Sequence, residues 1–252
     1  MKIVFVKRID TTNKSIFYSF IKTNNELIAF GRKHYGSERI IKKITVDEHF
    51  DVIEDNNVHF RGEDPRCFEY KNKIYVLDNY LNDMYLIDYA SNKYTKINIS
   101  GKNLSFINHN NTLYFIHYIK PFKLYTFDVD TGYIRHIEVD DDNNTHNYEY
   151  RGGTVGYKLN ENEYYGFGHR TYFAQGNNVL KHDIFKWIVH FEDNKLPRIS
   201  IFDVEQPDNS KNICDPTSVI EVNCKKYLIT AETDRAWFCE QDYVTNLYEI
   251  IE

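Results

Sequence analysis

The sequence predicts an all-β protein that folds as one five-bladed β-propeller over residues 1–252. Two observations lead to this prediction. The chain has 21 Tyr and 17 Phe but only 11 Gly and 5 Pro, and aromatic residues are enriched in strands. In addition, a pattern of strand, polar turn and strand recurs five times at a period of about 40–50 residues. No stretch has the 3.6-residue apolar period of a long helix.

Each repeat begins with two apolar stretches that flank a short polar turn. The five pairs span residues 15–32, 64–80, 104–118, 154–169 and 217–231. Further strands follow most pairs, so the chain offers about twenty strands in one series. A β-sandwich, the alternative all-β fold, needs only about 7–9 strands. The propeller is therefore favoured.

Residues 1–8 form an additional predicted strand at the start of the chain. The sequence leaves open whether this strand closes the ring by pairing with the last repeat. Its apolar run is too short for a signal peptide, and no segment approaches the ~20 apolar residues of a membrane helix. We therefore expect a cytoplasmic protein that is not inserted in a membrane.

The net charge of −6 and the absence of a basic tract argue against nucleic acid as a partner. The four cysteines, at positions 67, 214, 224 and 239, have no CxxC spacing. The ten histidines show neither HxH nor HExxH spacing. These patterns predict reduced thiols and neither a metal nor another cofactor. The oligomeric state is left open.

A dense charge cluster opens the second repeat, where Glu63, Asp64 and Arg66 surround Pro65. Proline restricts itself and the preceding residue to extended conformations, so this segment enters a strand. In a propeller, the entrances of the inner strands converge at one end of the central channel. Equivalent positions of the other repeats also carry polar or charged residues, namely Arg32, Lys102, Asn103, Lys120, Arg151, His169, Arg170, Asp215 and Asp234.

Such a ring of groups suits an oxygen-rich substrate that carries or meets an anion. Carboxylates hydrogen-bond sugar hydroxyls, and one can act as a general acid, whereas Arg and His hold phosphate. Gly152 and Gly153 would let the backbone approach a ligand closely. Taken singly, each residue is more often structural; Arg66, for example, could simply pair with Glu63. Two alternatives stay open: a propeller that binds a glycan or phosphorylated ligand without chemistry, and a protein-interaction platform.

The segment Glu63-Asp64-Pro65-Arg66 resembles the EDPR motif of the five-bladed β-mannoside phosphorylases and their hydrolase and mannosyltransferase relatives. Other elements resemble the same group in the same order, namely Ser19 with Arg32, Lys102-Asn103-Leu104, Ile119-Lys120-Pro121, Arg151-Gly152-Gly153-Thr154, Gly168-His169 and Thr233-Asp234. The resemblance covers nearly the whole chain, although EDPR is its most specific part.

The resemblance implies that Asp64 is the general acid and works through a substrate hydroxyl. It also implies that Arg66 and Asp234 bind the sugar. We expect Arg32, Glu63, Lys102, Asn103 and Asp215 to complete the sugar site. The anion, either phosphate or a nucleotide sugar, would meet Lys120, Arg151, His169 and Arg170. The phosphate-pocket tyrosine of the phosphorylases is not evident near Phe185-Lys186-Trp187, so phosphorolysis, glycosyl transfer and hydrolysis all remain open.

Overall fold

The computed structural model describes residues 1–11, 15–23, 26–35, 38–80, 83–99, 101, 103–141, 149–174, 179–235 and 242–252. Regular structure in these residues consists of β-strands, with no α-helix among them. Accordingly, the described part of the chain offers no helix that could span a bilayer. The predicted site residue Lys102 lies outside the described residues. So do residues 236–239, an apolar stretch that is expected to form a further strand of the last repeat.

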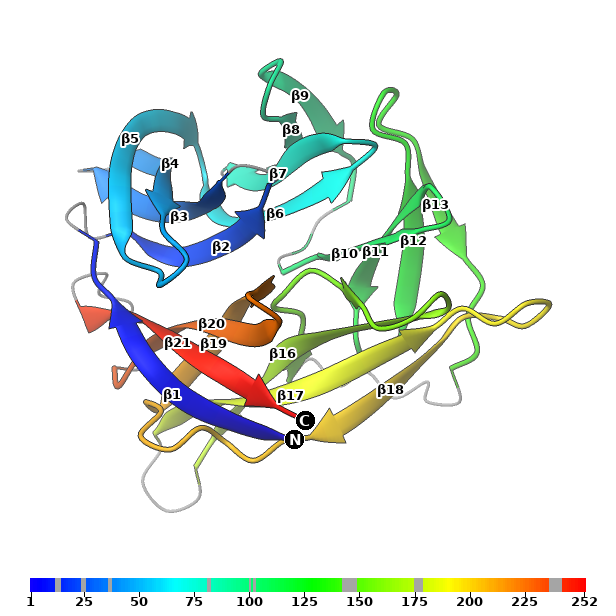
Figure 1. The fold of residues 1–252 in the computed structure, drawn as a ribbon. Coiled ribbons are helices and arrows are strands. Elements are labelled where there is room, and N and C mark those ends of the chain that lie inside the picture. Colours follow the sequence, from blue (N-terminus) through cyan, green and yellow to red (C-terminus); the bar gives the residue numbers. More distant parts are fainter. Residues whose placement is uncertain are drawn as a thin grey trace.

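Three four-stranded sheets correspond to the first three predicted repeats (Figure 1). In each sheet the strands pair in chain order and antiparallel, as expected for hairpins joined by short polar turns. Their strands are β2 (Ile16–Lys22), β3 (Leu27–Tyr35), β4 (Glu38–Val46) and β5 (Val52–Arg61); β6 (Glu63–Tyr70), β7 (Lys73–Tyr80), β8 (Asp83–Asp88) and β9 (Lys93–Ile97); and β10 (Ser105–His109), β11 (Thr112–Tyr118), β12 (Lys123–Phe127) and β13 (Ile134–Ile137).

The remaining strands form one nine-stranded sheet. They are β14 (Tyr150–Arg151), β15 (Tyr157–Lys158), β16 (Glu163–Phe173), β17 (Leu180–His190), β18 (Arg198–Asp203), β19 (Ile213–Val222), β20 (Lys225–Thr233), β21 (Val244–Ile251) and β1 (Lys2–Ile9). The sheet has two antiparallel parts, which meet where β17 and β19 pair in parallel at His182 and Ile213. The predicted inner strand at 154–159 is mostly irregular, with only β15 as regular structure.

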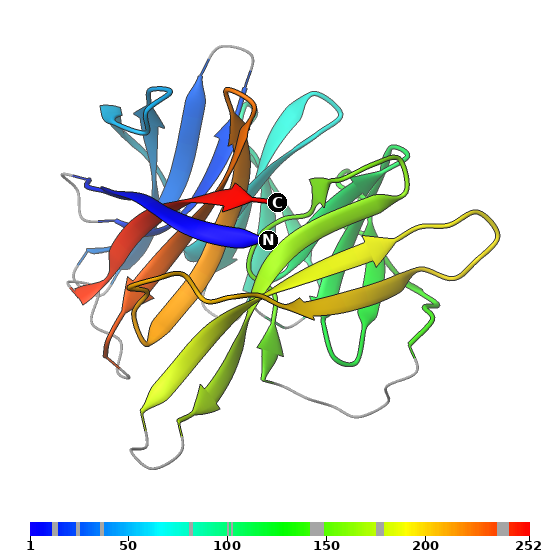
Figure 2. The ribbon, with the colours of Figure 1, turned by 60° about the horizontal axis from the view of Figure 1, so that its bottom comes forward.

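The N-terminal strand completes the last group of strands. β1 pairs antiparallel with β21, from Lys2 opposite Ile251 to Ile9 opposite Thr245. Figure 2 shows the two strands side by side, with the two termini next to each other. The question that the sequence left open is thus answered: β1 forms the outer edge of the sheet that contains β19, β20 and β21.

The sheets are arranged around a common centre, with β2, β6 and β10 on the inside (Figure 1). Contacts between these inner strands join neighbouring sheets. The Cys67 N–H donates to Ser19 Oγ at 2.9 Å, and the Phe68 and Phe106 rings stack at 4.5 Å between centroids. Apolar side chains fill the wedge between the β6 and β10 sheets.

Similar hydrogen bonds connect the rest of the chain to the β10 sheet and the β2 sheet. The Gly156 N–H donates to the Phe106 carbonyl at 2.7 Å, and the Phe20 N–H donates to Ser218 Oγ at 3.0 Å. A central cavity of about 300 Å³ is lined by residues of β2, β6, β10, β19 and the segment 155–157. Five chain segments, one from each predicted repeat, therefore surround the same space.

Candidate functional site

Two inner strands open with the same dipeptide, Asp64-Pro65 in β6 and Asp215-Pro216 in β19. Proline has no N–H for the strand ladder, and both pairings shift register at this point. Asp64 has a φ of 51°, in the left-handed region that is uncommon for a residue other than glycine, so the expectation that Pro65 holds Asp64 extended is wrong. The local sequence thus interrupts both ladders beside a carboxylate.

The first carboxylate group is built around Arg32 of β3. Its Nη1 lies 2.5 Å from Asp64 Oδ1 and 3.2 Å from Glu63 Oε2. Arg39 Nη1 reaches the same Glu63 oxygen at 2.5 Å, and the Arg32 guanidinium lies over the Phe17 ring. The sequence suggested Arg66 as the partner of Glu63, but the structure places Arg32 and Arg39 there.

Arg66 connects this group to the second one. It is 2% exposed, and it donates from Nε to the Gly153 carbonyl and from Nη1 to the Pro65 carbonyl at 2.8 Å. Burial lowers the pKa of Arg66, whereas the charges of Asp64 and Asp215 oppose this effect. The charges of two carboxylates from different strand entrances therefore both act on this buried guanidinium.

The second group contains Asp215 and two histidines. His182 Nδ1 lies 2.6 Å from Asp215 Oδ1, and His169 Nδ1 lies 3.5 Å from the same oxygen. The two imidazoles stack with their centroids 4.6 Å apart and their planes 14° apart. His182 was not predicted, because it lies within an ordinary alternating strand and its partner is 33 residues away.

Burial shapes the ionisation of this second group. It lowers the pKa of His169 to about 4, although the Asp215 charge opposes the shift. Burial would raise the pKa of Asp215, but the His169, His182 and Arg66 charges together hold it below its usual value. At neutral pH the group is thus a carboxylate beside a neutral His169.

Tyr243 is a second residue that the sequence did not single out. Its ring packs on Phe17 at 5.2 Å between centroids. Burial raises the pKa of Tyr243, Asp215 and Asp64 raise it further, and Arg32 opposes them. The Tyr243 hydroxyl is therefore close enough to both carboxylate groups for their charges to act on it.

The four predicted anion-binding residues do not all meet. Arg151 is exposed and pairs with His169 across β14 and β16. Lys120 Nζ instead lies 5.0 Å from the centroid of the Tyr150 ring, and Tyr150 pairs with Arg170. Because neighbouring residues of a strand point to opposite faces, Arg170 and His169 lie on opposite faces of β16. Tyr150 and Arg170 line a separate cavity of about 160 Å³.

Two further predicted residues have other surroundings. Asp234 has a side chain that is 61% exposed, and it contacts Lys211 at 3.3 Å and the Asn212 N–H at 3.2 Å. Asn103 adopts a φ of 60° in the segment that leads into β10. Its carbonyl oxygen would lie 2.2 Å from a Cβ placed on Gly152. These contacts do not involve the carboxylate groups described above.

The two adjacent glycines have a structural explanation. A Cβ on Gly153 would approach the Phe167 and Pro216 carbonyl oxygens to 2.7 Å. We had expected Gly152 and Gly153 to make room for a ligand. The room is instead occupied by the backbone of neighbouring strands, so these glycines serve the packing between sheets.

His169, His182 and Asp215 also offer three possible metal ligands. Their donor atoms all lie within 4.8 Å of one another. The expectation that the chain has no metal set came from spacing along the sequence. That reasoning does not cover this group, because its members come from β16, β17 and β19 and meet only in the folded chain.

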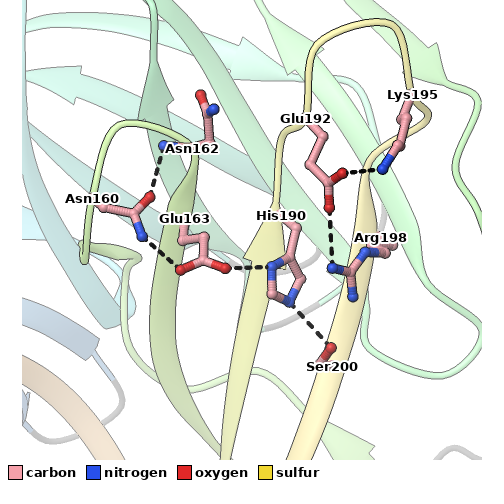
Figure 3. A network of polar contacts seen from close by, with 8 residues as sticks. All are labelled: Asn160, Asn162, Glu163, His190, Glu192, Lys195, Arg198 and Ser200. Atoms are coloured by element: carbon pink, nitrogen blue, oxygen red, sulfur yellow. Dashed lines mark hydrogen bonds and ion pairs between the residues drawn. The ribbon is translucent and has the colours of Figure 1, made fainter.

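A separate polar network crosses the other end of β16, β17 and β18 (Figure 3). His190 contacts Glu163 Oε1 through Nδ1 at 2.8 Å and Ser200 Oγ through Nε2 at 3.1 Å. Glu163 and His169 are six positions apart on β16, roughly 20 Å along a strand. Both ring nitrogens of His190 have protein partners, as expected for a network that stabilises the sheet.

No protein-family model matches the chain, and no curated protein matches it. Solved structures with a similar fold do exist. The α-L-arabinofuranosidase of Podospora anserina, solved with cellotriose, has a TM-score of 0.67 at 8% identity and covers 98% of this chain and 96% of its own.

Two other structures give the same result. A mannose phosphorylase from Leishmania mexicana, solved with a phosphate ion, has a TM-score of 0.64 at 8% identity, with 98% of this chain and 87% of that chain covered. A GH62 hydrolase solved with xylotriose has a TM-score of 0.57 at 10% identity, with coverages of 99% and 97%. At these identities the likeness concerns the fold, so the chain shares the β-propeller fold of these carbohydrate-active enzymes.

Proposed function

We propose that this protein is a carbohydrate-active enzyme with its active site at the entrances of β6 and β19. The nine-stranded sheet counts as two blades in this proposal, which makes five in all. The enzyme transfers or phosphorolyses a mannoside-like glycosyl unit with inversion. The main supporting observation is that the charges of Asp64 and Asp215, two carboxylates from similar Asp-Pro segments, both act on the buried Arg66 guanidinium.

Asp64 is the proposed general acid. Its contact with Arg32 is that of a carboxylate, so the acid must receive a proton before it acts. Solvent supplies this proton. Asp64 then gives it to a sugar hydroxyl that has replaced Arg32 at Oδ1, and the hydroxyl passes its own proton to the leaving oxygen, so that Asp64 ends the step as a carboxylate. This path agrees with the resemblance to enzymes in which the acid works through a substrate hydroxyl.

The attacking group is proposed to be an anion or water at the opposite side of the sugar. The charges of Arg66, His169 and His182 act on Asp215, and the charge of Arg151 acts on His169. With phosphate as nucleophile, cations suffice and no second base is needed. With water as nucleophile, the His182–Asp215 pair is the candidate base, because Asp215 orients the imidazole.

The central cavity is less suited to this chemistry. It is lined by Lys22, Glu69 and Glu221, near the ends of the inner strands, whereas Asp64 and Asp215 lie near their beginnings. Apolar residues dominate the rest of its wall, among them Phe20 and Phe68. We therefore place the reaction at the strand entrances.

A direct test compares the wild type with Asp64→Asn. Both are incubated with β-1,2- and β-1,4-linked mannobiose, with and without inorganic phosphate, and released mannose and mannose 1-phosphate are measured. The proposal predicts turnover by the wild type and a loss of about 100-fold or more in Asp64→Asn, with the disaccharide still bound. Asp234→Asn, a change at an exposed carboxylate, shows whether the sugar site extends that far.

A second candidate function is binding without chemistry. It is favoured by the pairing of Arg32 with Glu63 and Asp64, which leaves the acid engaged inside the protein. In this case Asp64→Asn changes the affinity for a glycan, and neither protein produces free sugar or sugar phosphate.

A further inference from the structure

We propose that His169, His182 and Asp215 form a binding site for one transition-metal dication of the Zn²⁺ class. Each side chain offers one ligand atom, and these atoms lie within 4.8 Å of one another. The three residues come from β16, β17 and β19, where the two parts of the nine-stranded sheet meet. The inference concerns residues that the proposed function also uses, but its test does not depend on the sugar chemistry.

The strongest observation is the state of His169. Its side chain is 94% buried, and among the described residues its Nδ1 has no hydrogen-bond partner. The nearest acceptor, Asp215 Oδ1, is 3.5 Å away, beyond a good hydrogen bond. Buried polar atoms without a partner are rare in native proteins, and a bound water or ion is one of the explanations for them. His190 shows the contrast, because both of its ring nitrogens have partners (Figure 3).

The ligand types define the class of cation. Two imidazoles and one carboxylate suit Zn²⁺ and its divalent neighbours, whereas Ca²⁺ and Mg²⁺ prefer sets of oxygen ligands. Three protein ligands leave a fourth position for water.

Metal binding requires a small rearrangement. Metal–ligand distances of about 2.0–2.2 Å place ligand atoms roughly 3–3.5 Å apart. The 2.6 Å contact between His182 Nδ1 and Asp215 Oδ1 is a hydrogen bond, so His182 must lose its Nδ1 proton and move away slightly. The stacked rings differ by only 14°, so one imidazole must also turn to direct its nitrogen at a shared metal.

Nearby arginines oppose a cation and provide a further test. The charges of Arg151 and Arg66 both act on His169, and the Arg151 side chain is exposed. Replacing Arg151 by glutamine should strengthen Zn²⁺ binding, because it removes a positive charge from the vicinity of the site. The same change should weaken phosphate binding if the proposed function is correct.

The experiment uses the full chain, freed of metal with a chelator and titrated with Zn²⁺ by calorimetry. Co²⁺ is added in parallel, since its visible absorption reports tetrahedral coordination by nitrogen and oxygen. We expect one equivalent in the wild type and a loss of affinity of at least about tenfold in His169→Ala and in His182→Ala. His190→Gln is the matched control and should bind like the wild type. Thermal melting verifies that each variant is folded.

The inference is overturned if the folded wild type binds no Zn²⁺, or if His169→Ala and His182→Ala bind as tightly as the wild type. Phosphate titrations of the wild type and of Arg151→Gln are read separately. Loss of phosphate binding in Arg151→Gln without any Zn²⁺ binding supports the proposed function and rejects the metal site. Zn²⁺ binding by the wild type without any phosphate binding supports the metal site and rejects the proposed function.

Discussion

Replacing Asp78 by asparagine should stabilise the protein at neutral and alkaline pH. Asp78 lies in β7 and is 1% exposed, and among the described residues neither carboxylate oxygen has a partner with good hydrogen-bond geometry. Burial raises the pKa of Asp78 to about 8, while the Glu63 backbone N–H only partly opposes the shift. The folded state therefore holds Asp78 protonated over a range in which the unfolded state releases the proton.

The size of the effect follows from the two pKa values. Stability from the protonated form is complete below pH 3.8, the ordinary value, and is lost as pH rises to about 8. Each pH unit within this window costs about 1.4 kcal/mol, so the wild type should lose about 4 kcal/mol between pH 4 and pH 7 through this one group. Asparagine does not ionise and escapes this loss.

The assay is urea unfolding of the wild type and Asp78→Asn at several pH values between 4.5 and 7.5. The difference in unfolding free energy should grow in favour of Asp78→Asn by about 1.4 kcal/mol per pH unit. Asp193→Asn, at an exposed carboxylate between β17 and β18, should keep the wild-type profile. Parallel profiles for the wild type and Asp78→Asn would refute the reasoning.

Three further changes test the packing around the strand entrances. Gly62→Ala should abolish soluble folded protein, because its Cβ would lie 1.4 Å from Asp78 Oδ1 at a φ of 152°; a normal yield and melting temperature would contradict this. Ser19→Ala should lower the unfolding free energy by about 1–3 kcal/mol in urea titrations, since it leaves the buried Cys67 N–H without its 2.9 Å acceptor. No change in the unfolding midpoint would show that this contact between sheets is dispensable. Ile3→Ala should cost about 2–5 kcal/mol in the same assay, because Ile3 of β1 is 4% exposed in the core. A negligible cost would mean that β1 does not contribute to the stability of its sheet.

The fold was largely predictable because its signal is local. Alternation of apolar and polar residues with short Asn-rich turns defines hairpins such as β10–β11, and these turns adopt positive φ at Asn110 and Asn111. The partner of β1 was not predictable, since pairing of the first strand with β21 is a contact between the two ends of the chain.

The site was predictable in part. Asp64, Arg32 and Glu63 meet as expected from their places at the strand entrances. His182 and Tyr243 were not predicted, because their partners are distant in sequence and no motif marks them. The separation of two neighbours, His169 and Arg170, could have been foreseen, because both lie in one strand and must point to opposite faces.

Melting temperatures with mannose 1-phosphate test the central claim most directly, because a ligand that binds the folded state stabilises it by RT ln(1 + [L]/Kd). If Asp64, Arg66 and Asp215 form one carbohydrate and anion site, the melting temperature of the wild type should rise with the logarithm of ligand concentration above Kd. The rise should shrink in Arg151→Gln and persist in His190→Gln. The absence of a rise in the wild type, or equal rises in all three proteins, would contradict the account.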